Sequence, residues 1–209
     1  MANLKCKICR RSGIKLFLKG ERCLGAKCSI VKRPYAPGPK GKRRTRALSE
    51  FGKELKEKQK LRNWYNLRER QFANYIEEAT LLTKKSGDAT EVLIGLLETR
   101  FDNVVFRLGL ASSRVQARQM VSHGHFLVNG RPINIPSFRV KKGDTITIKP
   151  NKLKKGAFLN LAEKIKKQKT PAWLTIDAST FEGKVIGLPS FEEAAPPVEI
   201  SSIFEYYSR

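Results

Sequence analysis

Apolar residues recur at helical spacing near the end of the first quarter of the chain. Leu48, Phe51 and Leu55 fall at positions i, i+3 and i+7, with charged residues between them, and this pattern predicts an amphipathic helix. Asn66, followed three residues later by Glu69, is typical of a capping box at the start of another helix. This part of the chain is therefore expected to be helical.

The middle of the chain combines a helical and an alternating pattern. Ser113 with Gln116 predicts a capped helix start, and Gly124 predicts a helix end in a left-handed conformation. Asn129-Gly130 lies between alternating apolar residues and is a hairpin signal. We expect a short helix pair packed on a small, mostly antiparallel sheet.

The last third of the chain alternates again and then ends in a helical stripe. Residues 173–176 and 185–188 are predicted strands, with Glu182-Gly183 as the turn between them. Within residues 200–207, apolar side chains at i, i+3, i+4 and i+7 predict an amphipathic helix. We expect this helix to pack on the earlier helical region, because its apolar stripe needs a partner surface.

The chain is strongly basic. Its 209 residues include 42 Lys and Arg against 19 Asp and Glu, a formal net charge of +23. Phosphates would supply the missing counter-charge, so the composition indicates a nucleic-acid partner, with a solvated basic surface as the alternative. A membrane is disfavoured because no apolar run approaches the roughly 20 residues that span a bilayer. Since the N-terminus lacks the apolar core of a signal peptide, we expect a cytoplasmic protein.

All four cysteines, Cys6, Cys9, Cys23 and Cys28, lie near the N-terminus. A CxxC pair and a CxxxxC pair at this separation suit tetrahedral binding of one structural zinc ion, with every position filled by the protein. The alternatives are two disulfides, four unrelated thiols or an iron–sulfur cluster, and a cytosolic setting argues against disulfides. A basic segment with few large apolar residues would need the metal in order to fold.

Basic charge is concentrated in the first 46 residues, which hold fifteen Lys and Arg and one acid, Glu21. The segment RPYAPGPKGKRRTR at its end cannot build a core, because Pro and Gly prevent regular structure. We interpret it as an extension that contacts RNA, with a flexible linker as the alternative. The candidate RNA contacts in this extension and in the helix after it are Lys40, Lys42, Arg43, Arg44, Arg46, Lys53, Lys56, Lys60 and Arg62.

Arg114 and Arg118 lie four residues apart on the predicted short helix, so they are expected to project from one face. Two neighbouring guanidinium groups suit phosphate oxygens. A solvated helix face would be the ordinary explanation of two arginines alone, but the net charge favours an acidic partner. Both residues are therefore candidate RNA contacts.

The stretch SSRVQARQMVSHGHFLVNG, with the later VKKGD and TITI, resembles the RNA-binding module named after ribosomal small-subunit protein four. The module alone is not decisive, because pseudouridine synthases, a tRNA synthetase and stress proteins also contain it. The four-cysteine arm, RPYAPGPKGKRR, EKQKLRNWYNLRERQF and the final EYYSR extend the resemblance over nearly the whole chain. The chain as a whole is similar to the bacterial-type family of that ribosomal protein.

This resemblance implies a structural protein of the small ribosomal subunit, with no membrane partner and no small-molecule substrate. The family binds 16S ribosomal RNA early, at a multi-helix junction in the 5′ domain, and nucleates assembly of the subunit body. With the neighbouring ribosomal proteins five and twelve, it influences decoding accuracy. By motif match, the module's RNA contacts fall on Arg114, Arg118, Ser112, Gln119 and His123. Some family members lack the cysteines, so a metal is not universal.

The expected fold class is α+β, with a small RNA-binding module inserted in a mainly helical domain. Residues 1–46 form the zinc-bound arm and the basic linker, and residues 47–97 form the helical domain, completed by residues 198–209. Residues 98–160 form the module, and residues 161–197 add strands to it and return to the helical domain.

Two other classes of protein fit less well. An RNA-modifying enzyme carrying this module would need a catalytic domain, and the roughly 110 residues outside the module and the arm leave no room for one. A zinc-dependent transcription factor would need a long recognition helix and a dimer interface, which the sequence lacks. An RNA-binding translational repressor or an accessory protein of RNA modification stays open as the alternative.

Overall fold

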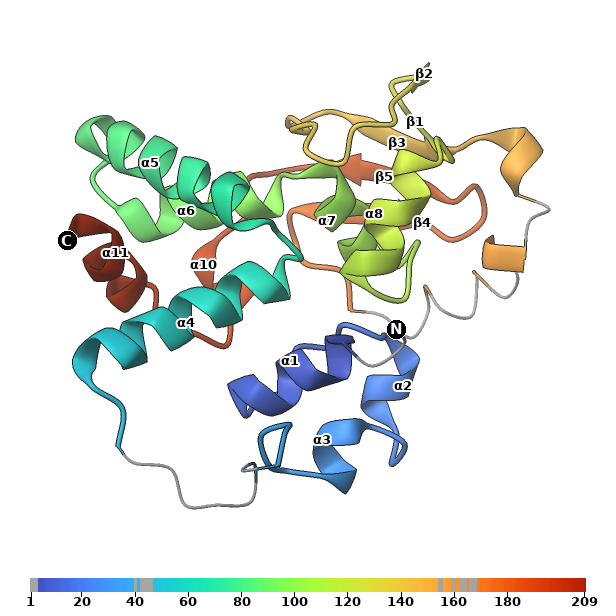
Figure 1. Ribbon diagram of the computed structural model, residues 1–209. Helices are drawn as coiled ribbons and strands as arrows, with labels where there is room; N and C mark the ends of the chain where they lie inside the picture. The colour runs from blue at the N-terminus through green and yellow to red at the C-terminus, as the bar shows by residue number, and fades with distance from the viewer. Residues whose placement is uncertain are drawn as a thin grey trace. The chain divides into compact units, whose positions relative to one another are not determined.

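The computed structural model describes residues 4–39, 41, 47–153, 156–158, 161, 165 and 169–209. The chain forms two compact units, Met1–Leu81 with Pro196–Arg209, and Leu82–Ala195. Helices occur together with an antiparallel sheet, which confirms the α+β fold class (Figure 1). The division between the units falls before the domain boundary expected at residues 97 and 98.

The first unit is helical in its described residues. Its elements are α1 (Leu4–Ser12), α2 (Glu21–Leu24), α3 (Ser29–Lys32), α4 (Glu50–Trp64), most of α5 (Glu69–Ser86) and α11 (Ser201–Ser208). Helix α1 packs against α3 and α4, and α11 lies along α4. The two ends of the chain therefore contribute to the same unit (Figure 1).

The buried face of α4 carries charged residues. Glu54 and Lys58 are buried, whereas Leu48 and Phe51 are exposed. The apolar stripe predicted through Leu48 and Phe51 was therefore wrong. The buried face of α4 combines Glu54 and Lys58 with Leu61 and Trp64. The C-terminal segment offers partners for these charges, including Arg209, whose Nη2 donates to Glu54 Oε1 at 2.8 Å.

Glu69 joins α4, α5 and α11. Its carboxylate accepts hydrogen bonds from Lys58 Nζ and Arg62 Nη1, each at 2.5 Å, and from the Tyr207 hydroxyl at 3.1 Å. Lys58 Nζ also lies 4.4 Å from the centroid of the Tyr206 ring. Burial raises the pKa of Glu69, but the hydrogen bonds from Lys58 and Arg62 outweigh burial and hold the pKa below its ordinary value.

Asn66 ends α4 instead of capping α5. Its φ is +56°, the Leu67 N–H donates to Arg62 O at 2.9 Å, and the Asn66 N–H donates to Asn63 O at 3.1 Å. A left-handed residue commonly closes a helix in this way, and Asn tolerates that conformation. The predicted capping box was therefore wrong, although α5 does begin at Glu69.

The second unit contains a five-stranded antiparallel sheet of order β2-β1-β3-β5-β4. The strands are β1 (Phe126–Val128), β2 (Arg131–Pro132), β3 (Thr145–Ile148), β4 (Leu174–Asp177) and β5 (Glu182–Val185). The helices described are α6 (Ala89–Glu98), α7 (Phe101–Arg107), α8 (Arg114–Ser122), η1 (Pro150–Lys152), η2 (Gly156–Phe158) and α10 (Phe191–Ala194). Helices α7 and α8 pack together and share a buried core with the strands (Figure 1).

Two turns of this sheet are joined by side-chain hydrogen bonds. Asn129 and Gly130 have φ values of +49° and +76° and connect β1 to β2, which confirms the predicted hairpin. Asn129 Oδ1 accepts from the Thr145 N–H at 2.9 Å, and Asn129 Nδ2 donates to Asp144 Oδ1 at 2.8 Å. Asp144 Oδ2 accepts from the Lys141 N–H at 2.7 Å. The hairpin is thus fixed to the turn before β3.

Gly183 lies inside β5, where it pairs with Ile176 of β4. A Cβ at this position would lie 2.5 Å from a Leu108 methyl group, which is buried in the core. Glycine therefore lets the strand approach the end of α7 closely. The predicted turn at Glu182-Gly183 was wrong, and the strand predicted at residues 185–188 begins where β5 ends.

Acid should weaken the packing of α11 through Glu69. Because folding lowers the pKa of Glu69, the stability from its ion pairs is present above its ordinary pKa of 4.5 and is lost as the pH falls through the lower folded value. Glu69→Gln should remove this part of the acid dependence in urea unfolding of the full chain. Glu205→Gln, at an exposed position of α11, is the control. An unchanged acid dependence in Glu69→Gln would contradict the role of Glu69.

Candidate nucleic-acid interface and cysteine cluster

Helix α8 begins at the predicted cap. The Ser113 hydroxyl accepts a hydrogen bond from the Gln116 N–H at 3.3 Å, and Gly124, just after the helix, has a φ of +63°. The Gln116 side chain does not close the capping box on Ser113. It accepts instead from the N–H and the hydroxyl of Ser112, at 2.8 and 2.5 Å. Ser112, a predicted RNA contact, therefore donates its hydroxyl proton within the protein.

Arg114 points into the second unit and is only 8% exposed. Its Nε donates to Asn103 Oδ1 at 2.8 Å, and its Nη2 lies 3.8 Å from Glu98 Oε1. Its guanidinium carbon lies 4.7 Å from the centroid of the Phe106 ring. The expectation that Arg114 projects with Arg118 from an open helix face was therefore wrong, because α6 and α7 offer Arg114 a buried carboxylate and an amide.

Glu98 is fully buried at the centre of these contacts. Arg107 donates to both carboxylate oxygens at 2.8 Å, and Asn103 Nδ2 donates to Oε2 at 2.8 Å. Arg107 also donates to the Ala194 carbonyl oxygen at 3.0 Å. A buried carboxylate is tolerated only when cations and donors replace water. Glu98 therefore ties α6, α7, α8 and α10 together.

Asp102 is a second buried carboxylate. Arg100 donates to it through Nε at 3.1 Å and Nη2 at 2.7 Å, and Arg118 Nη1 lies 3.6 Å from its Oδ2. Burial raises the pKa of Asp102, and the charges of Arg100 and Arg118 oppose this rise. Sequence reasoning missed both carboxylates as anchors for arginine. The available signal was a pair of acids, Glu98 and Asp102, four residues apart in the sequence of a basic chain.

Arg118 reaches the surface, with 31% of its side chain exposed. Gln119 and the C-cap residue His123 are exposed as well. The His123 ring lies 6.1 Å from the ring of His125, which is buried. Gln119 and His123 are therefore exposed and Arg118 is partly exposed beside Asp102, whereas Arg114 is buried against α6 and α7.

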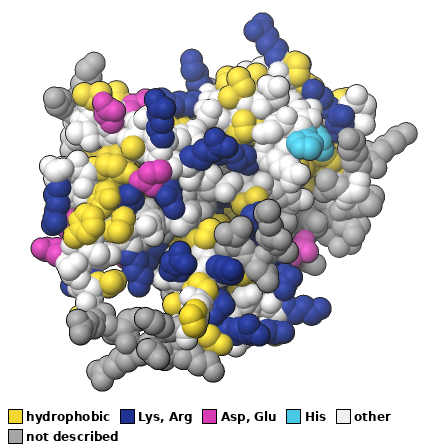
Figure 2. All heavy atoms as spheres, viewed as in Figure 1, with side chains coloured by type: hydrophobic (Ala, Val, Ile, Leu, Met, Phe, Trp, Pro, Cys, Tyr) yellow, Lys and Arg dark blue, Asp and Glu magenta, His cyan; other side chains and the backbone are white. Residues whose placement is uncertain are grey.

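Further cations are exposed on the same unit, next to its turns and on β5. Figure 2 shows Lys and Arg side chains across the face that it presents, with few acidic side chains among them. Some of these cations could have been found from the sequence, because they lie beside the Asn129-Gly130 hairpin and the turn before β3. Among the exposed cations of the described residues that were not singled out from the sequence are Arg131, Arg139, Lys141, Lys142 and Lys184.

The predicted RNA contacts of α4 differ in their surroundings. Lys53 is exposed and Lys56 is partly exposed. Lys60 forms an ion pair with Glu57, and Arg62 forms one with an acid of α5, so part of the charge of α4 is neutralised within the first unit. The predicted contacts that lie outside the described residues are Lys40, Lys42, Arg43, Arg44 and Arg46.

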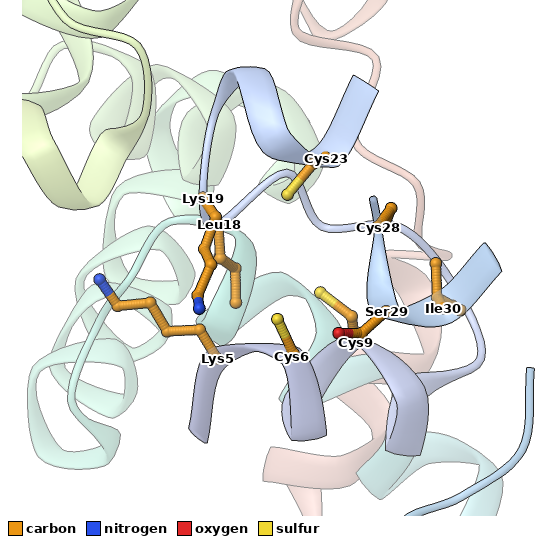
Figure 3. A pocket seen from close by; sticks show the side chains of 9 residues that line it. All are labelled: Lys5, Cys6, Cys9, Leu18, Lys19, Cys23, Cys28, Ser29 and Ile30. Atoms are coloured by element: carbon orange, nitrogen blue, oxygen red, sulfur yellow. The ribbon is translucent and has the colours of Figure 1, made fainter. Parts of the chain in front are cut away.

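The four cysteines line one small pocket (Figure 3). Cys6 and Cys9 belong to α1, Cys23 belongs to α2, and Cys28 is the N-cap of α3. All four are free thiols, so the two disulfides considered from the sequence are not formed. The cavity has a volume of about 20 Å³, close to the space that one water molecule needs.

The pocket has the donor types of a zinc site without its geometry. Among the described residues, no three Cys, His, Asp or Glu side chains are arranged to hold a metal ion. Burial raises the pKa of the Cys9 thiol, a hydrogen bond from the Leu16 backbone lowers it, and Cys23, Cys6 and Cys28 raise it further. Four soft donors around one cavity fit zinc, but binding would require the sulfurs to rearrange.

Comparison with known proteins supports the resemblance along nearly the whole chain. Residues 2–98 match the family described as ribosomal protein S4/S9 N-terminal domain, and residues 99–146 match the S4 domain. Small ribosomal subunit protein uS4 of Thermus thermophilus is 47% identical over 204 residues, which cover 98% of this chain and 96% of the relative. The chain belongs to the uS4 family. The uS4 proteins of Caldicellulosiruptor saccharolyticus and Kosmotoga olearia are 49% and 48% identical over the same shares.

The two uS4 family matches divide the candidate sites between them. The S4-domain match contains Arg114, Arg118, Gln119 and His123, and the N-terminal match contains the cysteines and α4. The similarity to uS4 relatives continues beyond both matches, because it covers 98% of the chain. Across the described ranges, no helix is both long and apolar enough to cross a membrane.

Arg114→Ala should destabilise the protein by about 2–4 kcal/mol, because Glu98 would stay buried with one cation fewer. Gln119→Ala, at an exposed position of the same helix, is the matched control and should change stability by less than about 0.5 kcal/mol. Urea unfolding of the full chain, followed by circular dichroism, measures both effects. Equal unfolding midpoints for the two variants would show that Arg114 has no structural role.

Proposed function

We propose that this chain is a structural protein of the small ribosomal subunit, in the cytoplasm, and that it binds 16S ribosomal RNA. The observation that carries the proposal is the similarity to uS4 proteins over 98% of the chain. The net charge of +23 supports it, because phosphates neutralise such an excess of cations. The role is structural and not enzymatic.

The proposed RNA-binding surface is centred on the outer side of α8. Gln119 and His123 are exposed there and Arg118 is partly exposed, while the buried Arg114 supports the helix through its contacts with Asn103 and Glu98. Contacts between Arg and phosphate position a protein on RNA without reading bases. Specificity would then come from the shape of the folded RNA.

Other exposed cations extend this surface. Arg131 begins β2 directly after the hairpin turn, and Lys141 and Lys142 lie at the turn before β3. Asn129 and Asp144 join these two turns, so the backbone positions of the three cations are fixed relative to one another. Separately from this surface, Lys53 of α4 and the cations of the 40–46 linker would contact phosphates from the first unit. Ser112 is left out of the surface, because its hydroxyl already donates to Gln116 within the protein.

The RNA target is a multi-helix junction in the 5′ domain, where early binding nucleates assembly of the subunit body. Ribosomal proteins five and twelve are the neighbours with which the chain influences decoding accuracy. The division of the chain into two compact units supports this role, because two linked basic units can hold separate RNA helices more tightly than either unit alone.

Cys6, Cys9, Cys23 and Cys28 are proposed to hold one structural zinc ion. Their common cavity and their free thiols support this site. The helices that carry them are short, since α2 and α3 each have 4 residues. Helices of this length are unstable by themselves, so metal binding would contribute directly to the folding of the arm.

Binding to the folded junction should depend on salt and on Arg118. Arg118→Ala should weaken binding by roughly tenfold, and it should reduce the slope of log affinity against log salt by about one phosphate contact. Lys169→Ala is the charge-matched control, because Lys169 is exposed on the same unit and is not part of the proposed surface. Filter binding of the full chain to the junction and to an unfolded RNA of equal length measures both. Equal affinity of wild type and Arg118→Ala would exclude α8 as the recognition surface.

Reduced, purified protein should contain one zinc ion per chain, and Cys9→Ser should lose it. Loss of the metal should increase hydrogen exchange in α1 to α3 and leave the second unit unchanged, because that unit has its own core. Ser29→Ala is the control, since Ser29 lines the same pocket without a thiol. Elemental analysis that finds no metal in the wild-type chain would refute the site.

A further inference from the structure

The charge of the chain changes sign near its C-terminal end. Residues 185–208 contain no Lys or Arg and four glutamates, although the net charge of the whole chain is +23. After the end of β5 at Val185, the part of this stretch that belongs to the second unit runs from Ile186 to Ala195, and we call it the acidic-apolar segment. It contains α10, which packs against α6. The proposed RNA-binding surface does not include it.

The acidic-apolar segment exposes large apolar side chains beside its acids. Ile186 is 48% exposed, Leu188 is 78% exposed and Phe191 is 37% exposed. Glu192 and Glu193 follow directly and are exposed as well. These five side chains lie within eight consecutive residues, so water faces three apolar groups and two carboxylates at one place.

The segment is held at both ends. At its start, the N–H groups of Ile186 and Gly187 donate to Trp173 O at 2.9 and 3.3 Å. At its end, Arg107 donates to Ala194 O at 3.0 Å and also to Glu98. A surface that is ordered before binding loses little conformational entropy when a partner arrives. The exposed side chains are therefore presented on a fixed backbone, as a binding surface requires and a passive linker does not.

The chemistry of the segment excludes several occupants. Glu192 and Glu193 would repel RNA phosphates and anionic lipid headgroups alike, and no cation of residues 185–208 offsets them. Ile186 and Leu188 have no aromatic ring on which a base could stack. A second copy of the chain in a symmetric contact would bring the same carboxylates together. A partner that carries cations and apolar side chains fits both features at once.

We propose that the acidic-apolar segment is a docking surface for a cationic protein surface within the assembled small subunit. The carboxylates of Glu192 and Glu193 receive Lys or Arg side chains of the partner, while Leu188 and Phe191 pack against its apolar groups. Five side chains amount to an interaction hot spot and not to a whole interface. The contact therefore forms inside the particle, where RNA already holds both proteins close together. The proposal rests on the proposed function.

Site-specific crosslinking in assembled particles tests the proposal. A photoreactive amino acid replaces Leu188 in the full chain, and small subunits are reconstituted from 16S ribosomal RNA and total small-subunit proteins. A second chain carries the same group at His123, on the proposed RNA-binding surface. Irradiation should link position 188 to a protein, through a peptide that contains Lys or Arg, and position 123 to RNA.

The outcomes separate this inference from the proposed function. Crosslinks from position 188 to RNA, or none at all in particles where position 123 does crosslink to RNA, would overturn the docking surface and leave the proposed function standing. A chain that fails to enter the particles would overturn both. Crosslinks from both positions to protein would preserve the docking surface and remove the proposed role of α8.

Reversing the charge of Glu192 gives a second, quantitative test of the docking surface. Glu192→Lys should reduce the protein crosslink from position 188 by roughly tenfold, the scale of a hot-spot contact, with unchanged incorporation into the particle. Glu91→Lys, which reverses another exposed acid of the same unit, is the matched control and should leave the crosslink as it was. Equal crosslink yields in the two variants would contradict the proposed charge complementarity.

Discussion

The carboxylate of Glu98 is buried without access to water, and four helices of the second unit meet around it. Arg107 and Asn103 of α7 satisfy its oxygens directly, Arg114 of α8 adds a nearby cation, and Arg107 reaches on to Ala194 of α10. Leaving such a group without partners would cost several kcal/mol. The helix that faces RNA in our proposal and the helix of the docking surface are therefore positioned by the same buried charge.

Only some of the Lys and Arg residues of this basic chain are available to contact RNA. Arg100, Arg107 and Arg114 are used in buried or half-buried ion pairs of the second unit, and Lys58 and Arg62 are used in the first unit. These five cations pair with three acids of the chain itself, Asp102, Glu98 and Glu69. The surface available to RNA is consequently set by which cations remain exposed, and this depends on the fold more than on the total count.

Local signals in the sequence predicted local structure well. Ser113 caps α8 and Asn129-Gly130 turns β1 into β2, because both outcomes depend on a few neighbouring backbone groups. Predictions that depended on distant partners failed. Gly183, for example, lies in a strand because Leu108 packs against it. One local signal failed as well, since Asn66 closes α4 in a left-handed conformation instead of opening the next helix.

The predictions of the candidate sites also succeeded where they depended on local structure and failed where they depended on distant residues. The cysteine spacing predicted four side chains around one pocket, and they lie there, since short connections bring them together. The spacing of Arg114 and Arg118 predicted a shared outward face, but periodicity cannot say which side of a helix will meet a buried acid such as Glu98. Nor could periodicity single out Arg131 or Lys142, which are exposed at and beside the turns of the sheet.

The side-chain bridge between the two turns of the sheet has a mechanical consequence. Asn129 and Asp144 fasten the β1–β2 hairpin to the turn before β3, and cations lie on both turns, among them Arg131, Lys141 and Lys142. Because the two turns are joined, the backbone positions of these cations cannot shift independently. The fold therefore fixes the spacing between the positive charges of the two turns. A phosphate backbone that matches this spacing can engage both turns at once, whereas one that is stretched or straightened can engage only one. The module would thus distinguish RNAs by the curvature of their backbones, through side chains that contact no base.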